Sequence, residues 1–262
     1  MLAAFMAAML IDVLTQAAWP ALVVGTLVIA AAAHEFFVMT RKIGAAPLVA
    51  PGVIAAALAF NLPWIMKYHP YGYDVGTLLA ALVIVASAGV LCRKLRQNAL
   101  TDVAVTIFGA VYIGLLSSYL VRIHLPDSGA KLVIYFVAVA KSADIGGYLT
   151  GKFLGRHKLA PNTSPNKTIE GAVGGILLSI AVAFALSSLL LPGHFSSSWK
   201  ILFALLVNVA AQFGDLAESV LKRSCNVKDS AVVLPRVCGA LDLIDSILLS
   251  APVGFYLIGW AW

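Results

Sequence analysis

The chain of 262 residues is strongly apolar: 61% of its residues are hydrophobic and 11% are charged, whereas a soluble domain carries about 25% charged residues. The mean hydropathy is +0.95. These values exclude a soluble globular enzyme, a disordered chain and a fibrous protein, and they favour a polytopic membrane protein. The formal net charge of +6 at pH 7 suits basic loops at a membrane surface, so no nucleic-acid partner is expected.

Nine apolar stretches, separated by charged residues, proline or glycine, predict an all-α, polytopic membrane protein with about nine transmembrane helices. They cover residues 1–16, 19–40, 47–66, 75–92, 101–121, 131–149, 172–191, 199–219 and 239–260. All but the first approach the roughly 20 residues that cross a bilayer, so the number is eight if the first stretch does not cross. Such continuous runs exclude a β-barrel, whose strands alternate in polarity over about ten residues.

We expect one membrane domain built from two parts. The first five stretches form an N-terminal set of transmembrane helices in residues 1–130, and the last four form a catalytic region in residues 131–262. No Lys or Arg precedes Arg41, so the first stretch lacks the basic segment of a signal peptide and is expected to be retained.

The basic residues predict how the chain is oriented. Thirteen of the 18 Lys and Arg residues fall in the loops after the second, fourth, sixth and eighth stretches. Four lie toward the opposite side, in the other loops or at the start of a stretch, and Lys141 lies in the middle of a stretch. Because Lys and Arg gather in cytoplasmic loops, the long loops 150–171 and 220–238 are expected to face the cytoplasm. We therefore expect an integral protein of the bacterial plasma membrane, with its active site on the cytoplasmic side.

Six of the carboxylates within the apolar stretches are candidate site residues, because a charged residue is costly there and usually functional. They are Glu35, Asp144, Asp215, Glu218, Asp242 and Asp245. Asp144, Asp215 and Asp242 each lie about one helical turn from a cytoplasmic end, so three helices place acids in one layer. Because facing carboxylates repel without a cation, and Mg²⁺ prefers oxygen ligands, we expect a Mg²⁺ site. The alternative to a metal site is that these acids form ion pairs with nearby Lys or Arg residues. For the isolated Glu35, a purely structural role is at least as good an explanation as a functional one.

The two long loops supply positive charge beside this layer. Residues 164–171 read Ser-Pro-Asn-Lys-Thr-Ile-Glu-Gly. Ser164 is expected to cap a helix that begins at Pro165, and Lys167 near that helix end would form a phosphate site. The second loop adds Lys222, Arg223 and Lys228. Carboxylates for Mg²⁺ and cations for phosphate are the parts needed for phosphoryl or nucleotidyl transfer, although basic loops can also serve only to orient the chain.

Four motifs lie between Ala143 and Ser246. They are Asp144-Ile-Gly-Gly-Tyr148, Ser164-Pro-Asn-Lys-Thr-Ile-Glu-Gly171, Phe213-Gly-Asp-Leu-Ala-Glu-Ser-Val-Leu-Lys-Arg223 followed by Lys228-Asp229, and Leu241-Asp-Leu-Ile-Asp-Ser246. These motifs resemble those of the CDP-diglyceride synthase (phosphatidate cytidylyltransferase) family. The resemblance implies an integral membrane enzyme that joins CTP and phosphatidate into CDP-diacylglycerol and pyrophosphate and that forms homodimers. It also implies that Asp215 and Asp242 bind metal.

The sequence departs from the family pattern at one place. The family signature ends with Pro-Gly-His-Gly-Gly, two residues, and Asp-Arg-x-Asp, whereas this chain reads Pro-Arg-Val-Cys-Gly-Ala-Leu-Asp-Leu-Ile-Asp from residue 235 to residue 245. Val237, Cys238 and Leu243 replace the family's His, one Gly and Arg. Both acids remain, so we expect an active but divergent member.

The residues and the resemblance together predict Mg²⁺-dependent in-line nucleotidyl transfer at the cytoplasmic membrane interface. Asp215 and Asp242 are the expected metal ligands, with room for a second cation nearby. The expected catalytic residues are Lys167, Lys222, Arg223, Lys228 and Asp144. The expected substrate-binding residues are Ser164, Asn166, Ser219, Asp229, Glu218 and Asp245. The alternatives are a CTP-dependent polyprenol or isoprenoid-alcohol kinase, a non-catalytic lipid-binding relative, and a cation-coupled transporter.

Overall fold

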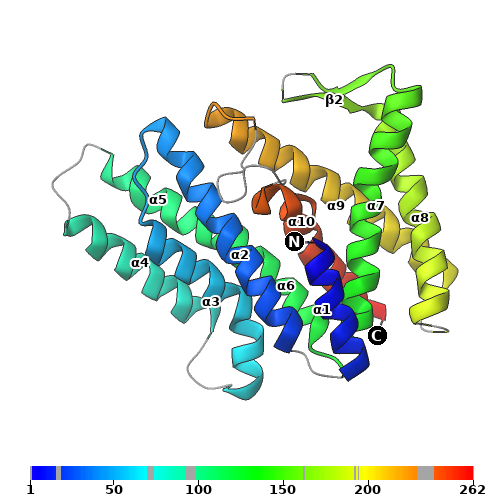
Figure 1. Cartoon of the computed structure of the whole chain (residues 1–262), viewed down its shortest axis with the longest axis horizontal. Helices are drawn as coiled ribbons and strands as arrows, with labels where there is room; N and C mark the ends of the chain where they lie inside the picture. The colour runs from blue at the N-terminus through cyan, green and yellow to red at the C-terminus, as the bar shows by residue number, and fades with distance from the viewer. Residues whose placement is uncertain are drawn as a thin grey trace.

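The computed structural model describes residues 2–15, 19–69, 74–92, 98–161, 163–191, 193, 195–228 and 239–261. These residues form an all-α structure with one short β-hairpin (Figure 1). The α-helices are α1 (Leu2–Thr15), α2 (Trp19–Thr40), α3 (Val49–Tyr68), α4 (Val75–Leu91), α5 (Ala99–Gly109), α6 (Leu116–His124), α7 (Gly129–Leu154), α8 (Ile169–Leu190), α9 (Ser197–Ser224) and α10 (Ala240–Ala261). A short 3-10 helix, η1 (Arg41–Ile43), follows α2, and a π-helical turn, η2 (Ala110–Leu115), joins α5 to α6.

Seven of the described helical segments are long and apolar enough to cross a membrane. They are Trp19–Ile43, Val49–Tyr68, Ala99–His124, Gly129–Leu154, Ile169–Leu190, Ser197–Ser224 and Ala240–Ala261. The remaining two, α1 and α4, are apolar but have only 14 and 17 residues. The structure therefore supports the predicted polytopic, all-α membrane protein, whereas the count of nine transmembrane helices stays a prediction.

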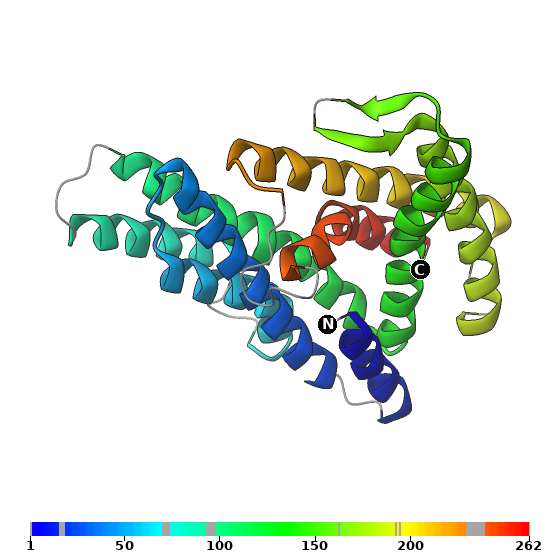
Figure 2. The ribbon, with the colours of Figure 1, turned by 45° about the horizontal axis from the view of Figure 1, so that its top comes forward.

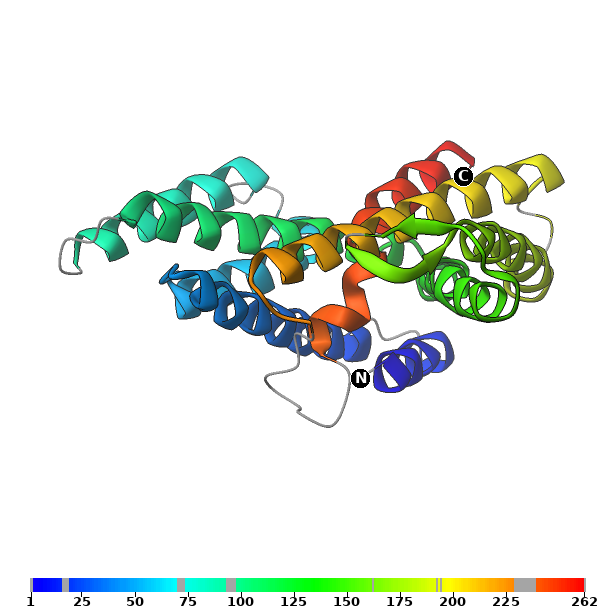
Figure 3. The same ribbon diagram turned by 90° about the horizontal axis from the view of Figure 1, so that it is seen from above.

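Helix α10 connects the two predicted parts of the chain. It packs against α2 and α6 from the N-terminal part and against α7 and α9 from the C-terminal part. Figure 3 shows α4 and α5 at one end of the molecule and α7 and α8 at the other. Because α10 begins with Asp242 in its first turn, this central position brings the second acidic motif into contact with elements from both parts.

Helices α7 and α8 lie side by side because small residues line their contact. A Cβ atom on Gly146 would lie 2.8 Å from the carbonyl oxygen of Gly174, and one on Gly175 would lie 2.8 Å from that of Ala143. Only residues without a Cβ allow two backbones to approach this closely, as is common between membrane helices. The close pairing fixes the direction in which Asp144, on α7, faces the rest of the molecule.

A buried polar chain ties α9 to this pair. The hydroxyls of Ser142 on α7 and Ser179 on α8 are 2.9 Å apart, and the side-chain amide of Asn208 on α9 donates to Ser179 at 2.7 Å. All three side chains are buried. Hydrogen bonds between apolar helices add specificity to a contact that apolar surfaces alone leave loosely defined, so α7, α8 and α9 are held in one register.

The segment between α7 and α8 corrects one prediction. Residues Lys158–Ala160 (β1) and Ser164–Thr168 (β2) form an antiparallel hairpin, which extends from the ends of α7 and α8 over α9 (Figures 1 and 2). The predicted helix start at Ser164 and Pro165 was therefore wrong. In a two-stranded hairpin each strand is an edge, where a proline is tolerated. Helix α8 begins later, where Thr168 Oγ1 accepts a hydrogen bond of 3.1 Å from the backbone N–H of Gly171.

Candidate active site

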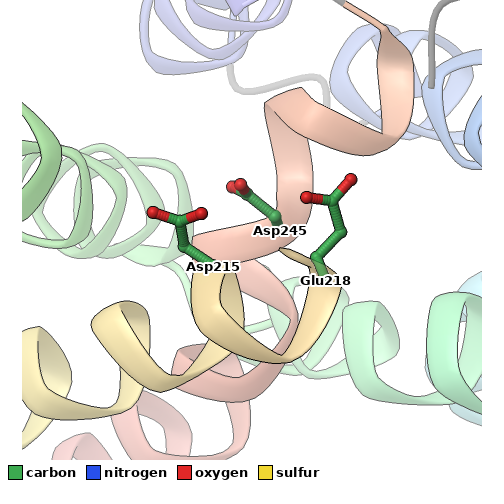
Figure 4. A group of neighbouring side chains, drawn as sticks. All are labelled: Asp215, Glu218 and Asp245. Atoms are coloured by element: carbon green, nitrogen blue, oxygen red, sulfur yellow. The ribbon is translucent and has the colours of Figure 1, made fainter. Parts of the chain in front are cut away.

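Three carboxylates from two helices form a compact cluster. Asp215 and Glu218 on α9 and Asp245 on α10 each place one oxygen within 4.8 Å of those of the other two (Figure 4). Glu218 is fully buried, and Asp245 is 8% exposed. The i, i+3 spacing of Asp215 and Glu218 was evident in the sequence, but only the packing of α10 against α9 adds Asp245.

A direct backbone contact between α9 and α10 produces this cluster. A Cβ atom on Gly214 would lie 2.4 Å from the carbonyl oxygen of Asp245, a separation that no real side chain tolerates. Gly214 directly precedes Asp215 in the chain. The absence of a side chain at this position therefore allows the two acidic motifs to meet.

Three lysines contact the acidic residues. Lys167, which the hairpin carries, forms an ion pair with Asp215. Lys222 Nζ lies 2.7 Å from Glu218 Oε2 and 2.9 Å from Asp242 Oδ1. Each of these contacts joins residues that the sequence had singled out. The predicted alternative of local ion pairing is thus present, and it coexists with the carboxylate cluster.

The third lysine, Lys141, is one that sequence reasoning missed. Its Nζ lies 3.2 Å from Asp144 Oδ2, 3.6 Å from Asp245 Oδ1 and 2.7 Å from Ser246 Oγ. It therefore bridges α7 and α10. The available signal was its position as the one Lys or Arg residue in the middle of an apolar stretch, away from either end, which on physical grounds marks a functional residue.

A cavity of about 340 Å³ lies between the hairpin and helices α7 to α10, against the acidic cluster. Its lining includes six of the predicted site residues: Asp144, Ser164, Asn166, Lys167, Asp215 and Asp245. Gln212 also lines it and had not been predicted; its side-chain amide donates to the carbonyl of Ala172 at 3.2 Å. The cavity thus joins a basic hairpin, an acidic cluster and several neutral hydrogen-bonding groups.

The hairpin that carries Lys167 is held at both ends. At its base, a carboxylate oxygen of Glu170 accepts a hydrogen bond of 3.1 Å from the N–H of Arg156, and the other lies 2.6 Å from His157 Nδ1. At its tip, Arg223 Nε donates to the carbonyl of Thr163 at 3.4 Å. Arg223 therefore ties the end of α9 to the hairpin over the cavity.

The remaining predicted residues lie outside the cavity wall. Asp242 contacts Lys222 next to the cluster, Ser219 is half-buried on α9, and Lys228 is exposed. Asp229 lies outside the residues that the structure describes, as do Val237 and Cys238. Asp215 and Asp245 thus belong to the three-carboxylate cluster, whereas Asp242 lies beside the cluster and contacts Lys222. The assignment of Asp215 and Asp242 as metal ligands stays a prediction.

Glu35, which the sequence left open, supports α10. It is 1% exposed on α2, and its Oε2 accepts a hydrogen bond of 3.0 Å from the backbone N–H of Leu241. The N–H groups in the first turn of a helix have no partner within that helix, and an anionic acceptor there also complements the helix dipole. Glu35 therefore anchors the end of α10 that carries Asp242.

The comparisons with known proteins identify the family. A family model described as the cytidylyltransferase family matches residues 1–260. The chain belongs to the cytidylyltransferase family.

Two of three similar curated proteins carry a name that agrees with this family, and the third is uncharacterized. The chain is 38% identical over 158 residues to a phosphatidate cytidylyltransferase of Bacillus subtilis, covering 60% of this chain and 58% of that protein. It is 41% identical over 132 residues to the uncharacterized protein YnbB of Escherichia coli, covering 50% and 44%. It is 33% identical over 192 residues to a phosphatidate cytidylyltransferase of Staphylococcus aureus, covering 73% and 70%. The first two matches therefore span less than two thirds of those relatives' lengths.

For a cytidylyltransferase family member, the donor set fits a divalent cation. The resemblance in the motifs implies a metal, and the clustered side chains of Asp215, Glu218 and Asp245 offer only carboxylate oxygens, which Mg²⁺ prefers. Of the three positions that depart from the family pattern, Leu243 is the one that the structure describes, and it faces away from the cavity. Leu243 packs against the apolar cluster that includes α2 and lines a small apolar pocket with Ile244. Leucine at this position, where the family signature has arginine, therefore contributes an apolar contact and does not form part of the cavity wall.

Proposed function

We propose that this chain is a phosphatidate cytidylyltransferase, which joins CTP and phosphatidate into CDP-diacylglycerol and pyrophosphate at the cytoplasmic membrane interface. The observation that carries the proposal is the cavity wall at which Lys167 meets Asp215. A cation for phosphate and a carboxylate for Mg²⁺ adjoin there, which is the arrangement that nucleotidyl transfer requires. The names of the Bacillus and Staphylococcus relatives also support it.

In the proposed reaction, an oxygen of the phosphatidate phosphate attacks the α-phosphorus of CTP. A new phosphorus–oxygen bond forms, and the bond from the α-phosphorus to the oxygen that leads to the β-phosphate breaks, so pyrophosphate leaves with that electron pair. The nucleophile is already an anion, and no side chain has to remove its proton. Mg²⁺, when bound, supplies positive charge that neutralises and orients the CTP phosphates.

The chain's own cations bind and orient the two polyanionic substrates. Lys167 and Lys222 are paired with acids in this structure, and their ammonium groups exchange these contacts for phosphate oxygens when substrate binds. Arg223 holds the hairpin over the cavity, and the exposed Lys228 lies in the basic segment after α9. Ser164 and Asn166 line the cavity and donate hydrogen bonds to the nucleotide.

The lipid tails have a path from the bilayer. Tyr148 on α7 lines the cavity and is 66% exposed. The neighbouring surfaces of α7 and α8 expose further large apolar side chains, including Ile145, Ile169 and Val173. An apolar surface beside a polar cavity suits a substrate with a phosphate head and acyl tails, so phosphatidate enters sideways from the membrane. The seven long apolar helices and the bacterial relatives support a location in the plasma membrane.

The test is a product analysis with the full chain purified in mild detergent. The protein is incubated with Mg²⁺, phosphatidate and CTP labelled at the α-phosphate. We expect labelled CDP-diacylglycerol and an equal amount of pyrophosphate, and we expect no product from the Lys167→Ala variant. In a parallel incubation with a polyprenol in place of phosphatidate, release of CDP with phosphorylated polyprenol would instead indicate a kinase and would contradict the proposal. The homodimer that the resemblance implies belongs to the proposal as well and is tested by light scattering of the same sample.

A further inference from the structure

A second polar cavity lies at the other end of the helices from the carboxylate cluster. Its volume is about 740 Å³, and it is lined by the end of α1, the start of α2, the end of α3 and the connection from α6 to α7. Lys131, in its wall, precedes Asp144 by 13 residues on α7, which corresponds to about 20 Å along a helix. Figure 1 shows α7 running from this connection toward the hairpin. The cavity is therefore separate from the candidate active site and belongs to the opposite membrane interface.

Two lysines in the wall of this cavity, Lys67 and Lys131, are available to bind an anion. Within the part of the chain that the structure describes, neither of them forms an ion pair. Lys67 Nζ instead lies 5.6 Å from the centre of the Trp64 ring and 5.9 Å from that of Tyr68. The lysines at the carboxylate cluster differ, because each of them contacts an acid. The two ammonium groups at the second cavity therefore have no acid to leave when an anion binds.

The first turn of α7 adds hydrogen-bond donors to the same wall. Ser128 precedes this helix, its side chain makes no capping hydrogen bond, and the first turn contains no acid. The N–H groups of a first turn have no partner within the helix and carry the positive end of its dipole. Ala130 and Lys131, both in this turn, line the cavity. A helix start and a lysine together form a typical phosphate site.

Two aspartates also line the cavity, so a simple anion does not match the whole wall. Asp127 is exposed, whereas Asp12 on α1 is 3% exposed. Asp12 Oδ2 lies 3.4 Å from His124 Nε2, and because a carboxylate accepts about four hydrogen bonds, this contact leaves capacity for a donor from the cavity. Among the described residues, the two lysines and two aspartates give the lining a formal charge of zero when His124 is neutral. A ligand that carries one negative and one positive group matches such a wall.

The surroundings of the cavity favour a lipid over a soluble ligand. Trp19, at the start of α2, lines the cavity and is 66% exposed. Val23 and Leu27, one and two turns further along α2, are 50% and 65% exposed, and the i, i+4, i+8 spacing places all three on one face of the helix. Aromatic side chains at the ends of transmembrane helices lie at the level of the lipid headgroups. This apolar stripe therefore leads from the polar cavity toward the acyl chains of the bilayer.

We propose that this cavity binds the headgroup of a zwitterionic phospholipid, with a phosphate diester and an ammonium group, in the leaflet opposite the active site. Lys67, Lys131 and the first turn of α7 bind the phosphate. Asp12 and Asp127 bind the ammonium group, and an acyl chain lies along the apolar stripe of α2. The site involves neither CTP nor a metal ion, so the inference does not depend on the proposed function.

The test measures lipid binding to the full chain in mild detergent, without CTP or metal. The probes are phosphatidylethanolamine, which is zwitterionic, and phosphatidylglycerol, which is anionic, with the same short acyl chains. Binding is followed by tryptophan fluorescence, because Trp19 and Trp64 line the cavity. We expect phosphatidylethanolamine to bind more tightly than phosphatidylglycerol. We expect its affinity to fall about tenfold in Lys131→Met, which loses a charge-assisted hydrogen bond. Asp127→Asn gives the lining a net positive charge and is expected to remove the preference for phosphatidylethanolamine.

Two variants serve as matched controls. Lys200→Met removes a lysine that, like Lys67, lies over an aromatic ring, that of Phe184, but is outside the cavity lining. Lys167→Met removes a lysine of the candidate active site. Both are expected to bind phosphatidylethanolamine as tightly as the unmodified protein does.

Four outcomes would overturn the inference. Equal or tighter binding of phosphatidylglycerol contradicts the role of the two acids, and unchanged binding by Lys131→Met contradicts the cavity as the site. Weaker binding by Lys167→Met would place the lipid in the candidate active site. Equal affinity for the soluble O-phosphoethanolamine would indicate a free zwitterion and contradict a lipid ligand. If Lys131→Met does not fold, Lys67→Met decides by the same criterion.

Discussion

Replacement of Gly214 by alanine is expected to separate the two acidic motifs and to reduce both stability and activity. The new methyl carbon would lie 2.4 Å from the carbonyl oxygen of Asp245, whereas C–H···O contacts have a C···O distance of about 3.3–3.6 Å, so α9 and α10 must move apart by about 1 Å. The neighbouring atom belongs to a backbone, so no side chain can rotate to make room.

The magnitude follows from two known effects. Insertion of a methyl group into a well-packed contact destabilises a protein by about 1–3 kcal/mol. Displacement of a catalytic group by about 1 Å reduces the rate by about 100-fold. Because Gly214 directly precedes Asp215, we expect the larger effect on activity, with the separation between the Asp215 and Asp245 carboxylates as its cause.

The assay compares Gly214→Ala with Gly259→Ala. Gly259 lies on the same helix as Asp245, but a Cβ atom there meets nothing within 4 Å, and alanine in a helix is more stable than glycine by up to about 1 kcal/mol. Thermal unfolding in detergent and the rate of CDP-lipid formation are measured for both variants. Full activity of Gly214→Ala, with an unfolding temperature equal to that of the unmodified protein, would refute the reasoning.

Three further substitutions test other contacts. Glu35→Ala leaves the N–H of Leu241 buried without its acceptor and is expected to destabilise the protein by about 1–3 kcal/mol; Glu35→Gln keeps an acceptor, so equal unfolding temperatures for the two variants would contradict a capping role. Thr168→Ala removes the cap of α8 and is expected to destabilise it by about 1 kcal/mol, whereas Thr168→Ser should be close to neutral in the same unfolding assay. Asp215→Asn is expected to abolish Mg²⁺-dependent product formation and to weaken Mn²⁺ binding; unchanged activity would exclude Asp215 as a metal ligand.

The class of fold followed from composition, because a bilayer demands long apolar segments whatever their later arrangement. The boundaries of the helices and strands were predicted less accurately from the sequence. The Ser164-Pro165 pair was read as a helix start, since proline suits the first turn of a helix, but the same residues also suit the edge of a hairpin. Local sequence does not distinguish these two uses, and the pairing of β2 with β1 decides between them.

The candidate site was partly predictable. Asp215 and Glu218 share a helix, so their spacing revealed their common face, and the depth of the acids placed three helices in one layer. The bridging role of Lys141 was not predictable, because its partners Asp245 and Ser246 lie more than 100 residues away in the chain. The anchor between Glu35 and Leu241 spans an even longer separation.

By itself, the sequence determined that this is a polytopic, all-α membrane protein, because that property depends on residue type and local spacing. It also predicts that the basic loops gather on one side of the membrane and that the buried acids serve functional chemistry. Only the tertiary structure decided which acids meet one another and which lysine neutralises each of them. The physical reason is that the sequence of an apolar helix does not specify which neighbouring helix its acids will face. Close contacts, such as that of Gly214 with the backbone of α10, determine which helices pack together and therefore which acids meet.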